Sequence, residues 1–234
     1  MVGKRQSLVI GASSDIGAAI AFALVPLSDR LVLWGRDEKR LAEAARRCIG
    51  VPVQTQVVDV TDAAGMADGL AAVQAAGPLA TVVWTPGLFD WASADRADPV
   101  TWQAVADVNL TAPTVFKAMV LPALVAAAPS ALIYLGSGAA HQVYPHNAAY
   151  IATKHGLAAL ARATYLDVRA HRVKVSLISP GMVAAGASLT APLTPAQRAR
   201  LLTPEDVASA VSYVVSFPDR GCPTEIRLQP HQSP

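Results

Sequence analysis

A tyrosine and a lysine four residues apart are the first candidates for chemistry in this sequence. Tyr150 and Lys154 lie in a helical pattern, so their spacing places both side chains on one face of a helix. A tyrosine hydroxyl has an ordinary pKa of about 10, too high for proton exchange near neutral pH. A neighbouring ammonium favours the phenolate and lowers that pKa. The pair could serve as a general acid and base, although the same spacing also occurs by chance.

A glycine-rich turn near the start of the chain is the second candidate. Residues 11–17 read Gly-Ala-Ser-Ser-Asp-Ile-Gly and lie between a predicted strand and a predicted helix. Backbone N–H groups at such a helix start bind phosphate, and glycines let the backbone approach it closely. The turn predicts a dinucleotide site, although small residues also form ordinary turns. The predicted contacts are Gly11, Ser13, Ser14, Asp15, Ile16 and Gly17.

The end of the second predicted strand bears on the choice of nucleotide. An NAD site usually carries Asp or Glu there, to bind the ribose 2′-hydroxyl. This sequence has Gly35 followed by Arg36, which favours a 2′-phosphate and hence NADP(H). The alternative is that Arg36 is a solvated surface residue. Asp59, after the third predicted strand, is placed to accept a hydrogen bond from an adenine amino group, unless it only forms the turn before Thr61.

Short apolar runs alternate with longer helical patterns along the chain. The apolar runs predict strands over residues 7–10, 30–34, 53–58, 79–84, 131–135, 173–178 and 225–228. The helical patterns cover residues 15–27, 37–48, 61–76, 98–124, 148–171 and 203–216. We expect the fourth helix to bend near Pro113. Residues 181–193 are rich in small side chains and predict a mobile loop.

This alternation predicts an α/β fold. Parallel strands joined by right-handed crossovers form a sheet with helices on both faces, and short, wholly apolar strands fit burial on both sides. We therefore expect a single doubly wound (Rossmann) domain over residues 1–234, with a parallel sheet of about seven strands. Its nucleotide-binding half covers about residues 1–90, and its catalytic and substrate half about residues 91–234.

Composition excludes several classes of protein. Hydrophobic residues make up 53% of the 234 residues and charged residues 15%, which excludes a disordered chain. The net charge of +2 and the scattered basic residues argue against a nucleic-acid partner. Residues 118–140 carry no charge, but prolines and glycines interrupt them, so they predict a helix end, a turn and a buried strand, not a membrane span. Cys48 and Cys222 have no metal-binding pattern. We expect a soluble cytoplasmic protein without a metal or a membrane partner.

Further motifs give the Tyr-Lys pair its weight. Ser137 lies thirteen residues before Tyr150, just past the fifth predicted strand, and Asn109 lies in the fourth predicted helix. In their order and spacing the motifs closely resemble those of the short-chain dehydrogenase/reductase family, over about residues 7–228. The matching segments are residues 11–17, Asp59-Val60, Val108-Asn109-Leu110, Ser137, residues 150–154 and Pro180-Gly181.

This resemblance implies a role for each residue of a tetrad. Ser137 would bond the substrate oxygen, and Tyr150 would give or take its proton. Lys154 would lower the tyrosine pKa and bind the nicotinamide ribose, while Asn109 would help to hold a water in a proton relay. The resemblance also implies a homodimer or homotetramer built on a four-helix contact. The further cofactor contacts that it implies are Val60, Gly87, Tyr150, Lys154, Pro180, Gly181 and Val183.

The chain departs from the family pattern at several positions. Asp15 stands where the phosphate turn usually has a glycine, so its carboxylate should point away from the phosphate or cap the helix. Pro86 lacks an N–H in the segment after the fourth strand. Ala185 replaces the threonine that touches the carboxamide, and Ile10 replaces a threonine before Gly11.

Aromatic and apolar residues are the candidates for the substrate pocket. They favour an uncharged substrate, although ordinary packing or surface exposure would explain each of them as well. The candidates are Phe89, Trp91, Tyr144, His146 and Met182, with His141 as a further one.

The leading hypothesis is an NADPH-dependent oxidoreductase that reduces a ketone or aldehyde to an alcohol, or runs the reverse reaction, with Tyr150 as general acid and base. One alternative keeps the fold and tetrad without a net redox outcome, as in an epimerase, dehydratase or cyclase. A non-catalytic nucleotide-binding regulator is the other alternative, and the complete tetrad argues against it.

Overall fold

The protein is built around one parallel sheet. The computed structural model describes residues 5–232. Seven strands lie in the order β3-β2-β1-β4-β5-β6-β7, and every neighbouring pair is parallel. The predicted α/β fold is confirmed, and each predicted strand is present. The strands are β1 (Gln6–Ile10), β2 (Arg30–Gly35), β3 (Val53–Val57), β4 (Leu79–Trp84), β5 (Ser130–Leu135), β6 (Val173–Pro180) and β7 (Glu225–Leu228).

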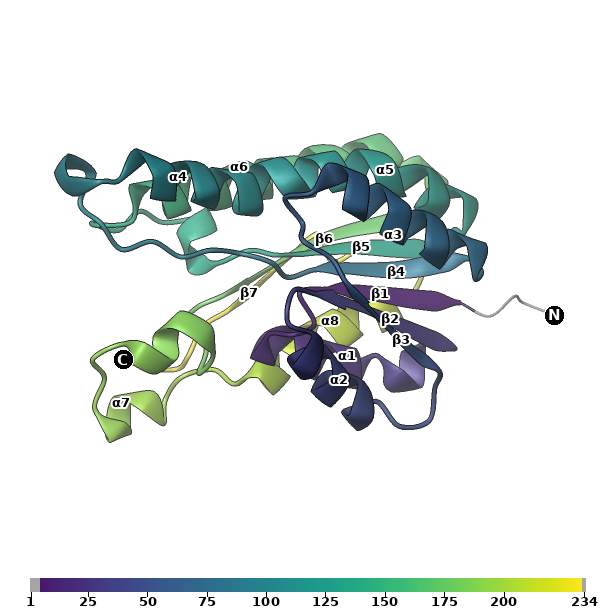
Figure 1. The fold of residues 1–234 in the computed structure, drawn as a ribbon, viewed down its shortest axis with the longest axis horizontal. Helices are drawn as coiled ribbons and strands as arrows, with labels where there is room; N and C mark the ends of the chain where they lie inside the picture. Colours follow the sequence, from purple (N-terminus) through teal and green to yellow (C-terminus); the bar gives the residue numbers. More distant parts are fainter. Residues whose placement is uncertain (1–4, 233–234) are drawn as a thin grey trace.

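Helices cover both faces of this sheet, and Figure 1 shows the two layers above and below it. Each layer closes its own apolar core: Phe116 and Leu157 lie in the upper core, and Ile20 and Val211 in the lower one. The upper helices are α3 (Ala63–Ala75), α4 (Pro99–Ala106), α5 (Ala112–Ala126) and α6 (Ala148–Val168). The lower helices are α1 (Asp15–Ala23), α2 (Glu38–Arg47) and α8 (Pro204–Ser216), with the short α7 (Pro195–Arg198) beyond them.

The fourth predicted helix is divided by an irregular turn. A π-helical turn, Asp107–Thr111, separates α4 from α5, so the irregularity lies just before Pro113. Proline has no N–H to donate to the carbonyl four residues earlier, which here is that of Asn109. Instead the Ala112 N–H bonds to the Asp107 carbonyl. Such π turns often occur at functional sites, and this one carries a residue of the predicted tetrad.

The same helical stretch bears on the membrane question. Within residues 5–232, Pro99–Ala126 is long and apolar enough to cross a membrane by length and composition alone. In this fold Phe116, Val120 and Leu124 turn one side of it into the upper core. This stretch is thus part of the helical layer that packs on the sheet.

Residues 181–193, predicted as an irregular loop, contain a 3₁₀ helix, Gly186–Thr190. Arg198 of α7 donates hydrogen bonds to the carbonyls of Ser188 and Leu189, which ties this segment to α7.

The strand order brings the loops of the site to one edge of the sheet. β1 pairs with β2 on one side and with β4 on the other, so the chain reverses its direction of winding there. In such sheets ligands bind beyond the carboxyl ends of the strands, at the reversal point. The loops after β1, β4, β5 and β6 all lie at this edge, and they carry the glycine-rich turn, Gly87, Ser137 and Gly181.

Candidate active site

The glycine-rich turn has the backbone of an anion site. Ser14 caps α1 and accepts a hydrogen bond from the Gly17 N–H, whereas the N–H groups of Asp15 and Ile16 lie in the first turn, where a helix offers no carbonyl. Gly11 has a φ of +83°, and a Cβ there would meet the Thr85 hydroxyl at 2.3 Å. A Cβ on Gly17 would meet the Gly11 carbonyl oxygen at 2.2 Å. These glycines keep the turn tight, and its outward amides fit a nucleotide phosphate.

The sequence left two roles open for the Asp15 carboxylate, to cap the helix or to point away from the phosphate. It does not cap the helix, because Ser14 does so. The carboxylate instead accepts a hydrogen bond from the Arg40 guanidinium at 2.6 Å. The ion pair offsets the negative charge beside the glycine-rich turn and brings Arg40 close to that turn. Arg40 was not predicted; the only sequence signal for it was the basic cluster Lys39-Arg40.

Gly35 ends β2 beside this turn, and Arg36 follows it. Gly35 packs against Ser13, and a Cβ on it would meet the Ser13 Oγ at 2.5 Å, so a side chain at position 35 would displace the turn. Arg36 is exposed and lies close enough to Asp59 to lower the pKa of that carboxyl. The larger cause of that lowered pKa is a pair of hydrogen bonds that Asp59 accepts from the Thr61 backbone and hydroxyl. Asp59 therefore has the turn role that its sequence position also allowed.

Ser137, Tyr150 and Lys154 meet beyond the end of β5. Ser137 begins the 3₁₀ helix Gly138–Ala140 and accepts a hydrogen bond from the Ala139 N–H at 3.1 Å. Tyr150 lies in the first turn of α6, and Lys154 lies one turn later. The Lys154 Nζ donates to the Leu135 carbonyl at 3.0 Å and lies 5.6 Å from the centroid of the Tyr150 ring.

Burial governs the protonation of this cluster. It raises the pKa of Tyr150, and a hydrogen bond with the Ser137 side chain lowers it by less. Burial also lowers the pKa of Lys154 to about 8, because a buried ammonium loses its hydration. In the protein alone the Tyr150 pKa thus lies above its ordinary value, which differs from the lowering expected from Lys154. Burial is the larger cause, and the opposing contribution comes from the Ser137 hydroxyl, not from Lys154.

Asn109 is fully buried in the π turn and links three segments. Its Oδ1 accepts from the Leu88 N–H at 2.7 Å, and its Nδ2 donates to the Leu88 carbonyl at 2.9 Å. The same Nδ2 donates to the Thr153 hydroxyl at 3.1 Å, and that hydroxyl donates to the Tyr150 carbonyl at 2.8 Å. The amide side chain therefore positions the segment after β4 against α6. The backbone carbonyl of Asn109 receives no hydrogen bond from residue 113, because Pro113 has no N–H.

The other predicted cofactor residues lie in different surroundings. A Cβ on Gly87 would lie 3.3 Å from the Lys154 Nζ, so glycine leaves room for the ammonium. Pro180 ends β6, and the Gly181 N–H pairs with the Leu228 carbonyl of β7. Val60 and Val183 are 8% and 7% exposed and pack in the upper and lower cores, so their side chains serve the fold.

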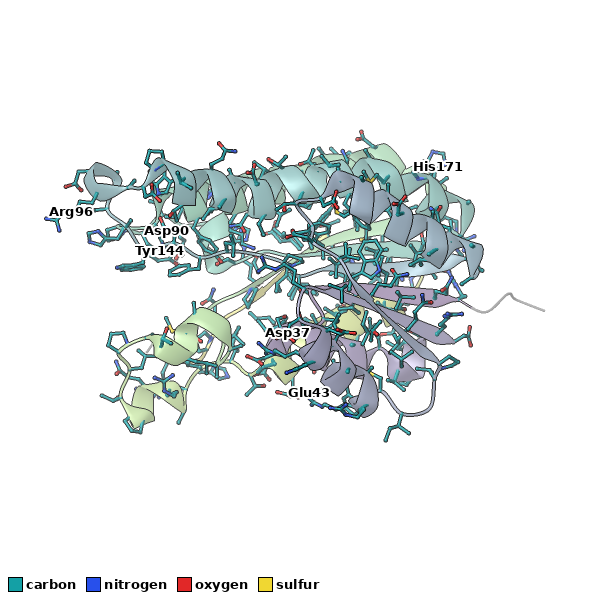
Figure 2. The ribbon with its side chains drawn as sticks, viewed as in Figure 1. Asp37, Glu43, Asp90, Arg96, Tyr144 and His171 are labelled. Atoms are coloured by element: carbon teal, nitrogen blue, oxygen red, sulfur yellow. The ribbon has the colours of Figure 1, made fainter. Side chains whose placement is uncertain are left out.

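The five predicted pocket residues are all exposed. Phe89, Trp91, Tyr144 and Met182 are 47%, 62%, 45% and 39% exposed, and His146 is exposed as well. Phe89 contacts Tyr150 edge to face, with ring centroids 5.0 Å apart. Figure 2 shows Tyr144 below the upper helical layer, on the side that faces α7.

The ring of His141 contacts β6 and β7. Its ring nitrogen Nε2 lies 3.0 Å from the Ser179 hydroxyl and 3.4 Å from the Glu225 carboxylate, and its side chain is 7% exposed. It joins the segment after β5 to β6 and β7. Its sequence position beside Ser137 suggested substrate contact, but this depends on which way the short 3₁₀ helix turns the ring.

Comparison with known proteins identifies the family. The family model described as short chain dehydrogenase matches residues 5–196. The chain belongs to the short-chain dehydrogenase family. An uncharacterized oxidoreductase from Staphylococcus saprophyticus is 29% identical over 230 residues, which cover 97% of both chains. Another from Staphylococcus epidermidis is 30% identical over 233 residues, 98% of both chains. This short-chain dehydrogenase is thus an oxidoreductase by family.

Solved structures agree on the fold. An alcohol dehydrogenase from Thermococcus sibiricus, complexed with 5-hydroxy-NADP, superposes with a TM-score of 0.89 at 24% identity and covers 98% of both chains. A metagenomic short-chain oxidoreductase in complex with NADP has a TM-score of 0.85 at 29% identity. That match covers 97% of the present chain and 98% of the other.

Proposed function

We propose that this short-chain dehydrogenase reduces a ketone or aldehyde to an alcohol with NADPH. The observation that carries the proposal is the meeting of Ser137, Tyr150 and Lys154 beside Gly87, at the edge that also holds the phosphate turn. When bound, the nucleotide supplies the hydride. The residues of the chain bind and orient the nucleotide and the substrate, and they move the proton.

Each side chain has a defined task in this reaction. Tyr150 donates its hydroxyl proton to the carbonyl oxygen as the alcohol forms. The Ala139 N–H bonds to the Ser137 oxygen and holds this hydroxyl beside Tyr150, where it would donate to the substrate oxygen. Lys154 binds the ribose and replaces the proton that Tyr150 loses, a role to which a pKa of about 8 is suited. The Asn109 carbonyl, which has no α-helical donor, holds a water that returns protons from solvent.

NADPH is proposed over NADH on the charges around β2. Arg36 is exposed at the end of that strand, and Arg40 lies nearby in α2. Guanidinium groups bind phosphate through paired hydrogen bonds. The solved relatives that contain NADP or a derivative of it are consistent with this choice.

A carbonyl panel with a tyrosine variant tests the reaction. We expect NADPH absorbance to fall with some ketone or aldehyde in the parent enzyme. Tyr150→Phe removes only the proton donor, so turnover should fall about 10²- to 10⁴-fold while NADPH fluorescence titration still shows binding. Tyr213→Phe, on the exposed side of α8, is the matched control and should keep its activity. Near-normal turnover in Tyr150→Phe would rule out the mechanism. NADPH binding without consumption across the panel would favour the non-redox or regulatory alternatives.

A further inference from the structure

A continuous row of aromatic rings begins at the catalytic tyrosine and ends in solvent. Tyr150 and Phe89 have ring centroids 5.0 Å apart at 75°. Phe89 and Trp91 follow at 6.0 Å and 31°, and Trp91 and His146 at 5.8 Å and 46°. We call Phe89, Trp91 and His146 the aromatic path. Each step has the spacing of interacting rings.

The rings of the path are exposed, unlike the large rings that fill the upper core. Trp34, Trp84 and Phe116 are at most 1% exposed and fill the upper core. Phe89 and Trp91 are 47% and 62% exposed. Single exposed apolar residues are common, but adjoining rings that lead to a reactive hydroxyl form a patch of the kind that binds a ligand.

The path is fixed in place at several points. Asn109 holds both backbone groups of Leu88, immediately before Phe89. The Trp102 ring N–H donates to Asp90 at 3.0 Å, and Ala92 forms a β-bridge with Asn147. A preformed surface binds a flat ligand without the entropy cost of ordering side chains.

The charge beside the path favours a neutral ligand. Asp90 is the only charged residue between Gly87 and Ala92, and its carboxylate is engaged by Trp102. A carboxylate or phosphate on the substrate would meet no cation from this segment and would lie near the Asp90 charge. Aromatic faces attract the edges and offset faces of other uncharged rings.

The geometry points to a substrate whose carbonyl is attached to a flat, uncharged system of two or more conjugated rings. The carbonyl lies at Tyr150 and the rings extend over Phe89 and Trp91. This inference rests on the proposed reductase activity. In the reaction the carbonyl carbon accepts a hydride from NADPH and the oxygen accepts the Tyr150 proton, which gives the alcohol and NADP⁺.

Three methyl ketones test the inference: 2-acetylnaphthalene, acetophenone and cyclohexyl methyl ketone, which share a reacting group and differ in their rings. We expect kcat/KM to be at least about tenfold higher for the naphthyl than for the cyclohexyl ketone. Trp91→Leu should reduce that ratio to about one, mainly through KM. Phe22→Leu removes a 53% exposed ring from α1 and should leave the ratio unchanged. Equal kcat/KM for all three ketones in the parent enzyme would overturn the aromatic inference and leave the reductase proposal standing.

A binding measurement separates the two proposals. Line broadening of 2-acetylnaphthalene in proton NMR reports binding in the presence of NADPH-saturated Tyr150→Phe enzyme, where reduction is slow. We expect broadening that Trp91→Leu in the same background removes. If it does so while the parent enzyme reduces no ketone, the aromatic site stands and the reductase proposal fails. Broadening that is equal with and without Trp91 would overturn the aromatic site.

Discussion

At the scale of single residues, several positions in the site are set by neighbours distant in the sequence. A Cβ on Gly87 would lie 3.3 Å from the Lys154 ammonium. A Cβ on Gly35 would lie 2.5 Å from the Ser13 Oγ, so both positions need glycine to leave room for a neighbouring side chain. Replacing Gly35 with Asp to create an NAD site would displace the phosphate turn. Arg36 is exposed, so it can be changed without disturbing packing. It therefore gives the cleaner test of nucleotide choice.

Arg36→Ala should weaken NADPH binding and hardly change NADH binding. A hydrogen bond to a charged group contributes about 1.5–3 kcal/mol, which corresponds to about 10- to 100-fold in Kd. Isothermal titration with both nucleotides measures the change. Arg46→Ala, an exposed arginine later in α2, is the matched control and should bind both as before. Equal affinity of the parent enzyme for NADH and NADPH would show that Arg36 does not select the nucleotide.

At the scale of elements, His141 connects the loop that carries Ser137 to the last two strands of the sheet, β6 and β7. It follows the 3₁₀ helix that Ser137 begins, and it contacts Ser179 of β6 and Glu225 of β7. Burial is the largest cause of its lowered pKa; Glu225 acts against it, and Arg227, Arg162 and His155 add to it. Burial thus favours the neutral form of this ring, which lies at a junction of three segments.

This lowered pKa predicts an acid-sensitive fold. The unfolded chain takes up a proton near the ordinary value of 6.5, whereas the folded protein takes it up only at lower pH. The free energy of unfolding should therefore be complete above that value and decline as pH falls toward the folded pKa. Urea unfolding at about pH 7.5 and about pH 5.5 measures the decline. His141→Asn should be less stable but should lose less between the two pH values. An equal loss in parent and variant would exclude His141 as the cause.

At the scale of the whole molecule, α6 presents small and apolar residues on its outer side. Ala152, Ala159, Ala163 and Leu166 are exposed, whereas Ala158 and Ala161 of the same helix are buried in the upper core. Exposed apolar surface of this kind is stabilised when a partner covers it. The family resemblance implies that the partner is a second copy.

We therefore expect a two-fold-symmetric oligomer in solution. Light scattering at micromolar concentration should give a mass at least twice the monomer value of 24.3 kDa. Ala159→Arg places a charge in the expected contact and should shift the protein toward monomer. Ala72→Arg, on the exposed side of α3, is the control and should leave the mass unchanged. A monomer mass for the parent protein would refute the expected assembly.

Local sequence patterns determined much of this protein. The strand ranges, the order of elements and the helical placement of Tyr150 and Lys154 follow from periodicity, because hydrogen bonding and side-chain direction repeat over a few residues. The glycine-rich turn follows for the same reason, since its helix start is local. The sequence by itself also carried the motif spacing that the family model matches.

Only the tertiary structure decided how distant segments meet. The Asp15–Arg40 ion pair joins residues 25 apart, and Asn109 binds Leu88 across 21 positions. The burial of His141 and the row of rings from Tyr150 to His146 depend likewise on how a short loop lies against α6. Such contacts depend on the packing of whole elements around two cores, which no local pattern in the chain records.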